Sequence, residues 1–415
     1  MKKAIYTLAF IGALYSCKTT QTSKENQPVI ASIDLVNVEE DKVSVSVDPD
    51  RFTTENTTFY IPKTVPGTYS TDNYGKFIEN FKALDYDGNE LEFEKIDDNS
   101  WNIPNAPNLD KVSYQVNDTY DIEDEEGVFS PSGTNIEAGE NFMLNLHGFV
   151  GYFENKQEEP YRLQIKRPQG LIPGTALSKT VAASEDMAFK EDIYSLGRYF
   201  EVIDNPIMYA KPDTTSFMVE GMEVLINVYS PNKKYTSKSI KPGIEEMISA
   251  QKRFLGEVDN TGKYAILLYL SDSEKQDARG FGALEHHTST VVVLPEAMQP
   301  EQLQKTMTDV VSHEFFHILT PLNVHSKEVH YFDYNDPKMS QHLWMYEGVT
   351  EYFANLFQIN QELIEKQDFY DRISDKIKSA QQFDDTMPFT KMSQNILEDP
   401  YKRWRNGNSG SYESP

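Results

Sequence analysis

The sequence predicts a multidomain α+β protein in which an N-terminal all-β, sandwich-like domain precedes a domain that mixes helices with strands. With 415 residues, the chain is longer than one hydrophobic core usually organises, since domains average roughly 150 residues. Hydrophobic residues recur with a period of two through much of residues 29–232, and helical periods become prominent in residues 233–415. These two ranges are therefore the two predicted domains.

The first 28 residues are expected to stand outside this fold. Met1-Lys-Lys3 precedes an apolar run from Ala4 to Leu14, a pattern typical of a secretion signal and too short to span a bilayer as a stable helix. Leu14-Tyr-Ser-Cys17 resembles a bacterial lipobox, so residues 1–17 are predicted to be a lipoprotein signal peptide. Cys17 is the only cysteine, so it has no partner for an internal disulfide, and an acyl anchor explains it. The alternative is a plain signal with an incidental cysteine. The polar residues 18–28 are expected to form a tether.

The predicted β domain begins at residue 29. Lys42-Val-Ser-Val-Ser-Val47 alternates strictly, and Tyr161–Ile165 and Met222–Val228 repeat that period, as half-buried strands do. Asp85-Tyr-Asp-Gly88 separates two such segments and indicates a hairpin, because glycine accepts a positive φ.

Charge excludes one class of function and leaves one local feature open. The chain has 65 acidic and 39 basic residues and a net charge of −26 without a basic patch, so no nucleic-acid partner is expected, because phosphate binding needs clustered Lys and Arg. The acidic cluster Asp121-Ile-Glu-Asp-Glu-Glu126 offers ligands for calcium. It lacks the ligand spacing of a known calcium loop, which favours a solvated loop instead.

The second predicted domain, residues 233–415, begins with a helix of about 16 residues opened by Pro242. Strands are expected at Tyr264–Leu270 and Thr290–Leu294. Pro300 should open a long helix that ends near Leu319, and a further helix should run from about His342 to Ile359.

The long helix carries His313-Glu-Phe-Phe-His317. Residues four apart lie on one helical face about 6 Å apart, so His313 and His317 can direct their imidazoles at one ion. Glu314 then stands where the general base of a zinc peptidase takes a proton from the attacking water. The alternative is an ordinary helix whose histidines merely meet partners at its edge.

A catalytic zinc site needs a third protein ligand, and two carboxylates compete for this role. Asp336 follows His317 after 18 intervening residues, but Pro337 makes its surroundings a turn. Glu347 follows after 29 residues within a segment of helical period, and it is the preferred ligand. Glu351, one turn further on, is predicted to accept the second N–H of a ligating histidine, unless it is simply an exposed helix residue.

Four segments together give the sequence a family resemblance. His313-Glu-Phe-Phe-His317, Trp344–Thr350, Gly282-Ala-Leu-Glu-His286 and the upstream Tyr60–Tyr69 resemble the glycyl aminopeptidase family of gluzincin metallopeptidases. The resemblance implies a thermolysin-like zincin fold for residues 233–415 and a zinc cofactor. It also implies release of N-terminal glycine or alanine from peptides with a free N-terminus.

Further site residues follow from the resemblance. By analogy with a related exopeptidase motif, Glu285 is expected to bind the substrate's ammonium, with Gly282 and Ala283 beside it in the substrate site; the alternative for Glu285 is a surface residue in a glycine-rich turn. No role is assigned to His286 or His287, although one of them could line the cleft.

The donor that stabilises the oxyanion is expected in a Ser-Tyr-Tyr-x-Lys-Gly-like segment, followed in the family by a PDZ-like domain. Here Ser411-Tyr412 precedes Glu-Ser-Pro, so Tyr412 is the candidate, and the C-terminal part of the domain is expected to be incomplete. His325 and His330 are the alternatives.

The sequence thus predicts a zinc aminopeptidase that is exported and anchored to a bacterial membrane through Cys17. Two other functions stay open. One is a zinc endopeptidase of the same clan, and the other is a catalytically inactive lipoprotein that binds peptide or glycan.

Overall fold

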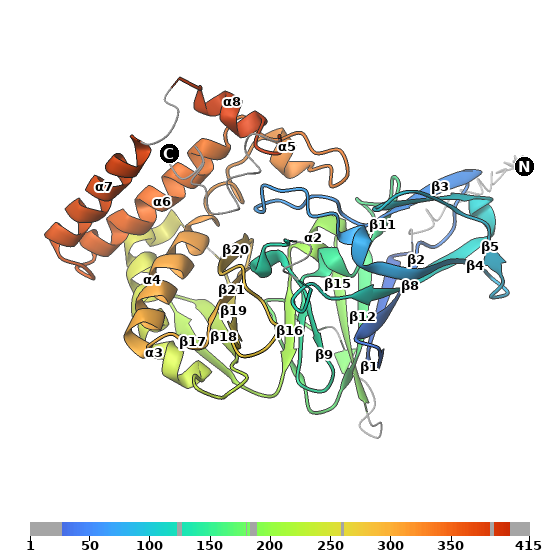
Figure 1. Ribbon diagram of the computed structural model, residues 1–415, viewed down its shortest axis with the longest axis horizontal. Coiled ribbons are helices and arrows are strands. Elements are labelled where there is room, and N and C mark those ends of the chain that lie inside the picture. Colours follow the sequence, from blue (N-terminus) through green and yellow to red (C-terminus); the bar gives the residue numbers. More distant parts are fainter. Residues whose placement is uncertain are drawn as a thin grey trace, which may run out of the picture.

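The computed structural model describes residues 27–122, 127–179, 181–182, 189–258, 261–381 and 386–398. Figure 1 shows a sheet-rich N-terminal part beside a C-terminal part in which helices cover a further sheet. The predicted fold class, a β-rich domain followed by a helix-containing one, is therefore confirmed. Cys17 and Tyr412 lie outside the described residues, as do residues 123–126 of the acidic cluster.

The described residues of the N-terminal part form three sheets. The largest has the strand order β14 (Val181–Ala182), β15 (Phe189–Leu196), β12 (Tyr161–Pro168), β1 (Val29–Glu39), β2 (Lys42–Asp48), β8 (Leu109–Asn117), β4 (Ile78–Asp85) and β5 (Glu90–Leu91). The second has the order β13 (Ile172–Gly174), β16 (Ile207–Ala210), β10 (Asn141–Leu144) and β9 (Asn135–Glu137). The third has the order β11 (Tyr152–Phe153), β3 (Asn56–Tyr60), β7 (Ser100–Pro104) and β6 (Glu94–Asp97).

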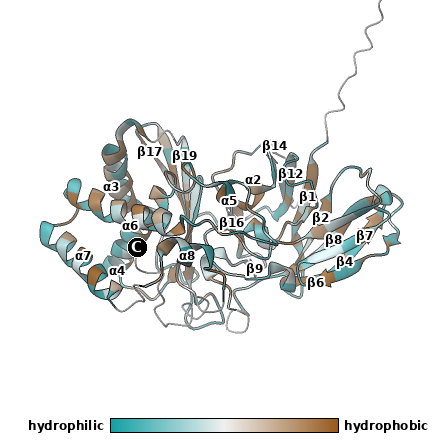
Figure 2. Cartoon of the chain, turned by 90° about the horizontal axis from the view of Figure 1, so that it is seen from above, coloured by the Kyte–Doolittle hydropathy of each residue, from teal (hydrophilic) through white to brown (hydrophobic). Residues whose placement is uncertain are grey.

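The period of two places one face of each long strand in the core. In β2, Val43, Val45 and Val47 are buried, and the turn after β4 has Gly88 at φ 83°, as the hairpin pattern predicted. Figure 2 shows hydrophobic and hydrophilic residues interleaved along these strands and along the helices.

A five-stranded sheet organises the C-terminal part. Its order is β17 (Thr214–Val219), β18 (Met222–Tyr229), β19 (Lys263–Ser271), β21 (Ser289–Pro295) and β20 (Gly282–His286). β18, β19 and β21 are parallel, and β17 and β20 are antiparallel edge strands. The sequence had placed Met222–Val228 before a boundary at 232, but β18 pairs with β19, so this sheet begins at Thr214.

Both faces of this sheet are covered. Ile266, Leu268 and Val292 pack under the helices, whereas Leu267 and Val291 pack toward Met143 and Met208 of the second N-terminal sheet. Strands buried on both sides are uniformly apolar, which explains the unbroken hydrophobic runs of β19 and β21.

In the part of the chain that the structure describes, the α-helices are α2 (Tyr199–Ile203), α3 (Ser237–Leu255), α4 (Pro300–Phe316), α5 (Lys327–His330), α6 (Leu343–Asn360), α7 (Lys366–Ala380) and α8 (Phe389–Gln394). The expected start of α3 at Pro242 is wrong. Thr236 and Ser239 form a capping box that starts the helix at Ser237 and leaves Pro242 inside it, because reciprocal capping satisfies the first free N–H groups. Among the described residues, no helix is long and apolar enough to cross a bilayer.

Candidate metal centre

Two helices carry the residues of the predicted metal site. Pro300 occupies the first turn of α4, and Leu303, Met307, Val311 and Phe315 are buried along one side of the helix. Fully burying such a side chain contributes about 1.5–3 kcal/mol each, so this face fixes the rotation of α4. The same rotation turns His313, in the last turn, and His317, at the C-cap, toward α6, which packs against α4 and contributes Glu347.

The three side chains converge. The Nε2 atoms of His313 and His317 are 3.1 Å apart, and Glu347 Oε2 lies 3.3 Å from the first and 3.6 Å from the second. Zinc bound at about 2.0–2.2 Å by tetrahedral ligands separates those ligands by about 3.3–3.6 Å. The donor set therefore fits zinc in both chemistry and spacing. Asp336 is absent from the ligand clusters of the described residues, whereas Glu347 completes one.

Each histidine is oriented by a bond at its other nitrogen. His313 Nδ1 lies 2.8 Å from Glu351 Oε2, and His317 Nδ1 lies 3.1 Å from the carbonyl oxygen of Thr320. Both partners accept a hydrogen bond, so Nδ1 carries the proton and Nε2 offers its lone pair to the ligand cluster. Glu351 thus lies where the sequence placed it.

Carboxylates around the cluster set its charge. Burial lowers the pKa of His313, but its bonds to Glu347 and Glu351 outweigh burial and raise it well above the ordinary value. Burial raises the pKa of Glu347, but His317 and His313 reverse this and bring it to about 2. This carboxylate is therefore ionised at neutral pH, as a metal ligand must be.

Glu314 and Glu285 lie together beside the ligands. Oxygens of both carboxylates and a ring nitrogen of His317 are all within 4.8 Å of one another. Burial raises the pKa of Glu314 to about 7, with the charge of Glu285 contributing, while His313 and His317 oppose the shift. Burial likewise raises the pKa of Glu285. Glu314 is thus poised to exchange a proton near neutral pH.

A loop of the N-terminal domain also reaches the site, which the sequence did not predict. Tyr69 donates its hydroxyl proton to Glu347 Oε1, leaving Oε2 toward the histidines. A Cβ atom at Gly67 would approach both carboxylate oxygens of Glu285 to 2.8 Å, and Gly67 has φ +84°. Tyr69 itself has φ 51°. Pro66-Gly67 signals a turn, but the position of Tyr69 depends on tertiary packing that no local pattern shows.

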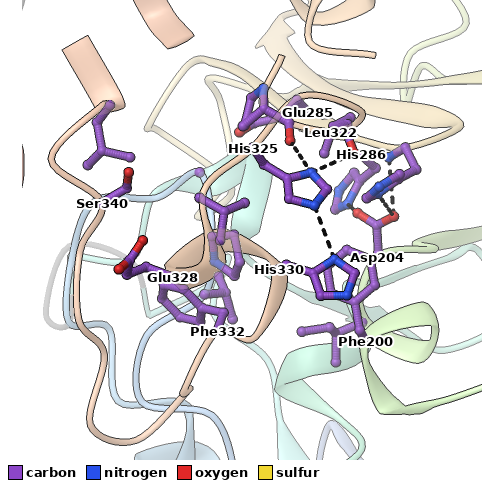
Figure 3. A pocket seen from close by; sticks show the side chains of 18 of the residues that line it. Phe200, Asp204, Glu285, His286, Leu322, His325, Glu328, His330, Phe332 and Ser340 are labelled. Carbon is purple, nitrogen blue, oxygen red and sulfur yellow. Dashed lines mark hydrogen bonds and ion pairs between the residues drawn. The ribbon is translucent and has the colours of Figure 1, made fainter. Parts of the chain in front are cut away.

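A cavity of about 280 Å³ opens beside Glu285 and extends away from the ligand cluster. Figure 3 shows Glu285, His286 and His325 around it. Its lining is mainly apolar and includes Val65, Ile203, Leu322, Phe332, Met339 and Leu343. Gly282 and Ala283 do not line it in the described chain: Gly282 lies against Phe129, and Ala283 packs against the core of the second domain.

Four further histidines, His286, His287, His325 and His330, lie on the cavity wall and outside the ligand cluster. His286 and His287 direct Nδ1 at Asp204, at 3.4 and 2.7 Å, and Asp204 is a partner that the sequence did not suggest. His325 Nε2 lies 3.1 Å from His330 Nδ1 (Figure 3). The assignment of an oxyanion donor to His325, His330 or Tyr412 stays a prediction.

Comparisons with known proteins agree with this arrangement. A family model of the peptidase M61 N-terminal domain matches residues 31–211, and one of the M61 glycyl aminopeptidase matches residues 306–413. The chain belongs to the M61 peptidase family. The predicted resemblance is therefore confirmed, and the N-terminal match ends just before β17. A comparison with curated protein sequences gave no match.

Solved structures share the fold of this M61 family member. An aminopeptidase N family protein from Idiomarina loihiensis superposes with a TM-score of 0.75 at 18% identity, over 93% of this chain and 63% of that protein. The chain thus spans less than two thirds of that relative's length. An M1 zinc metallopeptidase from Deinococcus radiodurans gives 0.51 at 10% identity, over 90% of this chain and 79% of that one. A mutant of that enzyme bound to a Tyr-Ser-Ala substrate gives 0.52 at 11% identity, with the same coverage.

Proposed function

We propose that this M61 protein is a zinc-dependent aminopeptidase that removes glycine or alanine from the N-terminus of peptides. The observation that carries the proposal is the cluster of His313, His317 and Glu347, whose ligand atoms lie 3.1–3.6 Å apart beside the buried carboxylate of Glu314. Membership of a peptidase family supports the same reaction class.

Each residue of the site would have its own role in the reaction. Zinc held by His313, His317 and Glu347 would supply a Lewis acid that polarises the scissile carbonyl and activates water. Glu314 takes a proton from the attacking water and delivers it to the leaving amine, for which a pKa near neutrality is suited. Glu351 and the carbonyl group of Thr320 hold the two imidazoles in place.

The position of Glu285 favours an aminopeptidase over an endopeptidase. In a substrate, the terminal ammonium and the first carbonyl carbon are separated only by the first Cα, a span of about 2.5 Å. A carboxylate for the ammonium must therefore lie within one residue of the reacting group, and Glu285 lies within 4.8 Å of both Glu314 and His317. Gly67 lets the backbone of the N-terminal loop approach this carboxylate directly.

Specificity for small residues rests on the family resemblance, and the cavity beside Glu285 provides a way to examine it. A space of about 280 Å³ with an apolar wall accommodates side chains larger than methyl. Rates on Gly-, Ala-, Leu- and Phe-arylamides would rank the residues accepted. Faster hydrolysis of the Gly- and Ala-arylamides would support the proposed specificity. Faster hydrolysis of the Leu- or Phe-arylamide would instead indicate specificity for large apolar N-terminal residues.

The reaction itself is tested by metal analysis and paired substrates. We expect one zinc per chain, hydrolysis of Ala-arylamide and no hydrolysis of its N-acetylated form. Glu314→Gln should keep the zinc and lose activity by at least about 10²-fold, and Glu285→Gln should raise KM for free N-termini. Cleavage of the blocked substrate would indicate the endopeptidase, and a zinc-loaded but inactive wild type would indicate the inactive binding protein.

Export and membrane anchoring belong to this proposal too, and they rest on the sequence of residues 1–17 alone. Metabolic labelling with palmitate should mark the wild type and not Cys17→Ser. A released, unlabelled protein would point to a plain secretion signal.

A further inference from the structure

Three aspartates from two segments, both far from His313, His317 and Glu347 in the sequence, lie close together. Asp41 lies in the β1–β2 turn, and Asp118 and Asp121 follow β8. One carboxylate oxygen of each lies within 4.8 Å of the other two. The sequence singled out only Asp121, as part of an acidic cluster, whereas the fold adds Asp118 and Asp41 to it.

Asp118 is the unusual member of this group, because its side chain is buried. The residue is 1% exposed. Its Oδ2 accepts a hydrogen bond from the Ile136 N–H at 2.5 Å, while its Oδ1 has no hydrogen-bond partner in the described part of the chain. Asp121 Oδ1 is also buried without a partner there. Burial and the neighbouring Asp121 raise the pKa of Asp118 well above its ordinary value. Keeping both carboxylates ionised in this place is therefore costly unless a cation lies between them.

The charges around these aspartates also favour a bound cation. These aspartates share a cavity of about 150 Å³ with Glu137 and Asp277. Those two carboxylates already accept hydrogen bonds from Tyr229 Oη at 2.6 Å and Tyr269 Oη at 2.8 Å. Lys275 lines the same cavity but forms no ion pair with any of the three aspartates in the described residues. Within the residues that the structure describes, no basic side chain forms an ion pair with these three aspartates.

We propose that Asp41, Asp118 and Asp121 form a calcium site. All three supply hard carboxylate oxygens and no nitrogen or sulfur, which favours Ca²⁺ over zinc. Calcium binds oxygen at 2.3–2.6 Å, so ligands on opposite sides of the ion are about 4.6–5.2 Å apart. Oxygens that all lie within 4.8 Å of one another fit around one such ion. The remaining coordination positions would be filled by water or by neighbouring oxygens of the cavity.

The location assigns this ion a structural role at the junction of the two domains. Gln276, in the loop after β19, donates a side-chain hydrogen bond to the carbonyl oxygen of Asp121. The ring of Tyr120 packs edge-on against that of Tyr269, with 5.0 Å between centroids. A cation on Asp118 and Asp121 would therefore fasten this segment of the N-terminal domain against the five-stranded sheet. This inference does not depend on peptidase activity.

Terbium luminescence of the zinc-loaded protein tests the site directly. Tb³⁺ has the oxygen preference of Ca²⁺, and Tyr229 and Tyr269 line the cavity and can sensitise its emission. We expect Tb³⁺ emission that saturates at one ion per chain and is displaced by Ca²⁺. In calcium-free buffer, adding 1 mM Ca²⁺ should raise Tm by at least about 3 °C, since a ligand of the native state stabilises it.

Three Asp→Asn variants distinguish the loss of a calcium ligand from the loss of a negative charge in the cavity. Asp118→Asn keeps an oxygen for the Ile136 N–H and should weaken Ca²⁺ binding at least tenfold. Asp41→Asn lies in an exposed turn at φ 62°, which asparagine tolerates, and it should also weaken binding if Asp118→Asn fails to fold. Asp272→Asn is the matched control: Asp272 lines the same cavity but accepts hydrogen bonds from Glu274 N and Asn232 Nδ2.

Two results would overturn the proposal. One is a wild type without Ca²⁺-dependent emission or Tm shift, which would show that Asp118 and Asp121 share a proton instead. The other is an equal loss of Ca²⁺ binding in Asp272→Asn and Asp118→Asn. That result would mean that the net negative charge of the cavity, and not coordination by Asp118, attracts the ion. Zinc content and arylamide hydrolysis are measured on the same samples, so loss of the proposed function is recognised separately.

Discussion

The hydrogen bond between Glu351 and His313 offers the sharpest test of how the metal centre is held. Glu351 Oε2 lies 2.8 Å from His313 Nδ1. Burial alone would raise the pKa of Glu351, but the bond to His313 outweighs it and brings that pKa to about 2. The carboxylate is therefore charged at every working pH, and its bond to the imidazole is charge-assisted. It fixes the tautomer that offers Nε2 to zinc and makes that nitrogen more basic.

Removing this carboxylate should weaken zinc binding without removing a ligand. Loss of such an outer partner typically costs 10–100-fold in metal affinity, which is about 1.4–2.7 kcal/mol. Glu351→Leu should lose the full amount, and Glu351→Gln should lose less, since its amide oxygen still accepts the N–H. Competition with a chromophoric chelator at pH 7.5 gives the affinities. With zinc saturating, kcat should stay within about threefold, because Glu351 does not touch substrate.

A neighbouring cation supplies the control. Lys376 Nζ lies 2.7 Å from the other oxygen of Glu351 and is 46% exposed. Lys376→Met removes this half-solvated ion pair, worth at most about 1 kcal/mol, and leaves the histidine bond in place. Its zinc affinity should change less than about threefold. Wild-type affinity in Glu351→Leu, or an equal loss in both variants, would refute the idea that Glu351 acts through His313.

Four more predictions follow from the same geometry. Tyr69→Phe, which deprives Glu347 of a donor, should weaken zinc binding by up to about tenfold in the same chelator competition. Gly67→Ala should raise KM for Ala-arylamide by at least about tenfold, since a Cβ meets Glu285 at 2.8 Å and a positive φ is strained; an unchanged KM would place the ammonium elsewhere. In the pH profile, kcat/KM should fall on the acid side as Glu314 gains a proton, with an apparent pKa below about 7 because bound zinc favours the carboxylate; a rate that climbs toward acid would contradict the assigned base. In metal-free protein, the folded pKa of Glu314, about 7 against an ordinary 4.5, means that protonation favours the native state. Stability should therefore be lost between pH 4.5 and 7, by up to about 3 kcal/mol relative to Glu314→Gln in urea unfolding.

The sequence revealed the parts of the site that follow from a local period. His313 and Glu314 lie in the last turn of α4 with His317 at its C-cap, and Glu347 and Glu351 lie one turn apart on α6. Helical geometry alone therefore predicted which side chains share a face. The sheets were predictable in kind from alternation, although β18 could not be assigned to its sheet, because pairing with β19 is a long-range event that leaves no local mark.

The contacts that the sequence did not predict join residues far apart in the chain. Tyr69 reaches Glu347 over 278 positions, and Asp204 receives both His286 and His287. Tyr69 ends a segment that contributes to the family resemblance, but nothing in the sequence links it to Glu347. Nothing near Asp204 distinguishes it from the other aspartates of the chain. Likewise, Asp118 looks like an ordinary residue at a strand end, and only its burial marks it as unusual.

The segment around Asp336 shows why spacing alone misleads about the third ligand. This segment serves to join the two domains: the carbonyl oxygen of Tyr334 accepts the N–H groups of Lys63 and Thr64, both at 3.0 Å, and its ring packs against Tyr152 and Tyr199 of the N-terminal core. Asp336 is held in that turn by Asp333. The same junction positions the loop that carries Gly67 and Tyr69 over Glu285 and Glu347. The ligands for zinc therefore come from one domain, but the wall against which a substrate's N-terminus would lie comes from the other. Weakening the contacts of Tyr334 should for this reason impair substrate binding more than zinc binding.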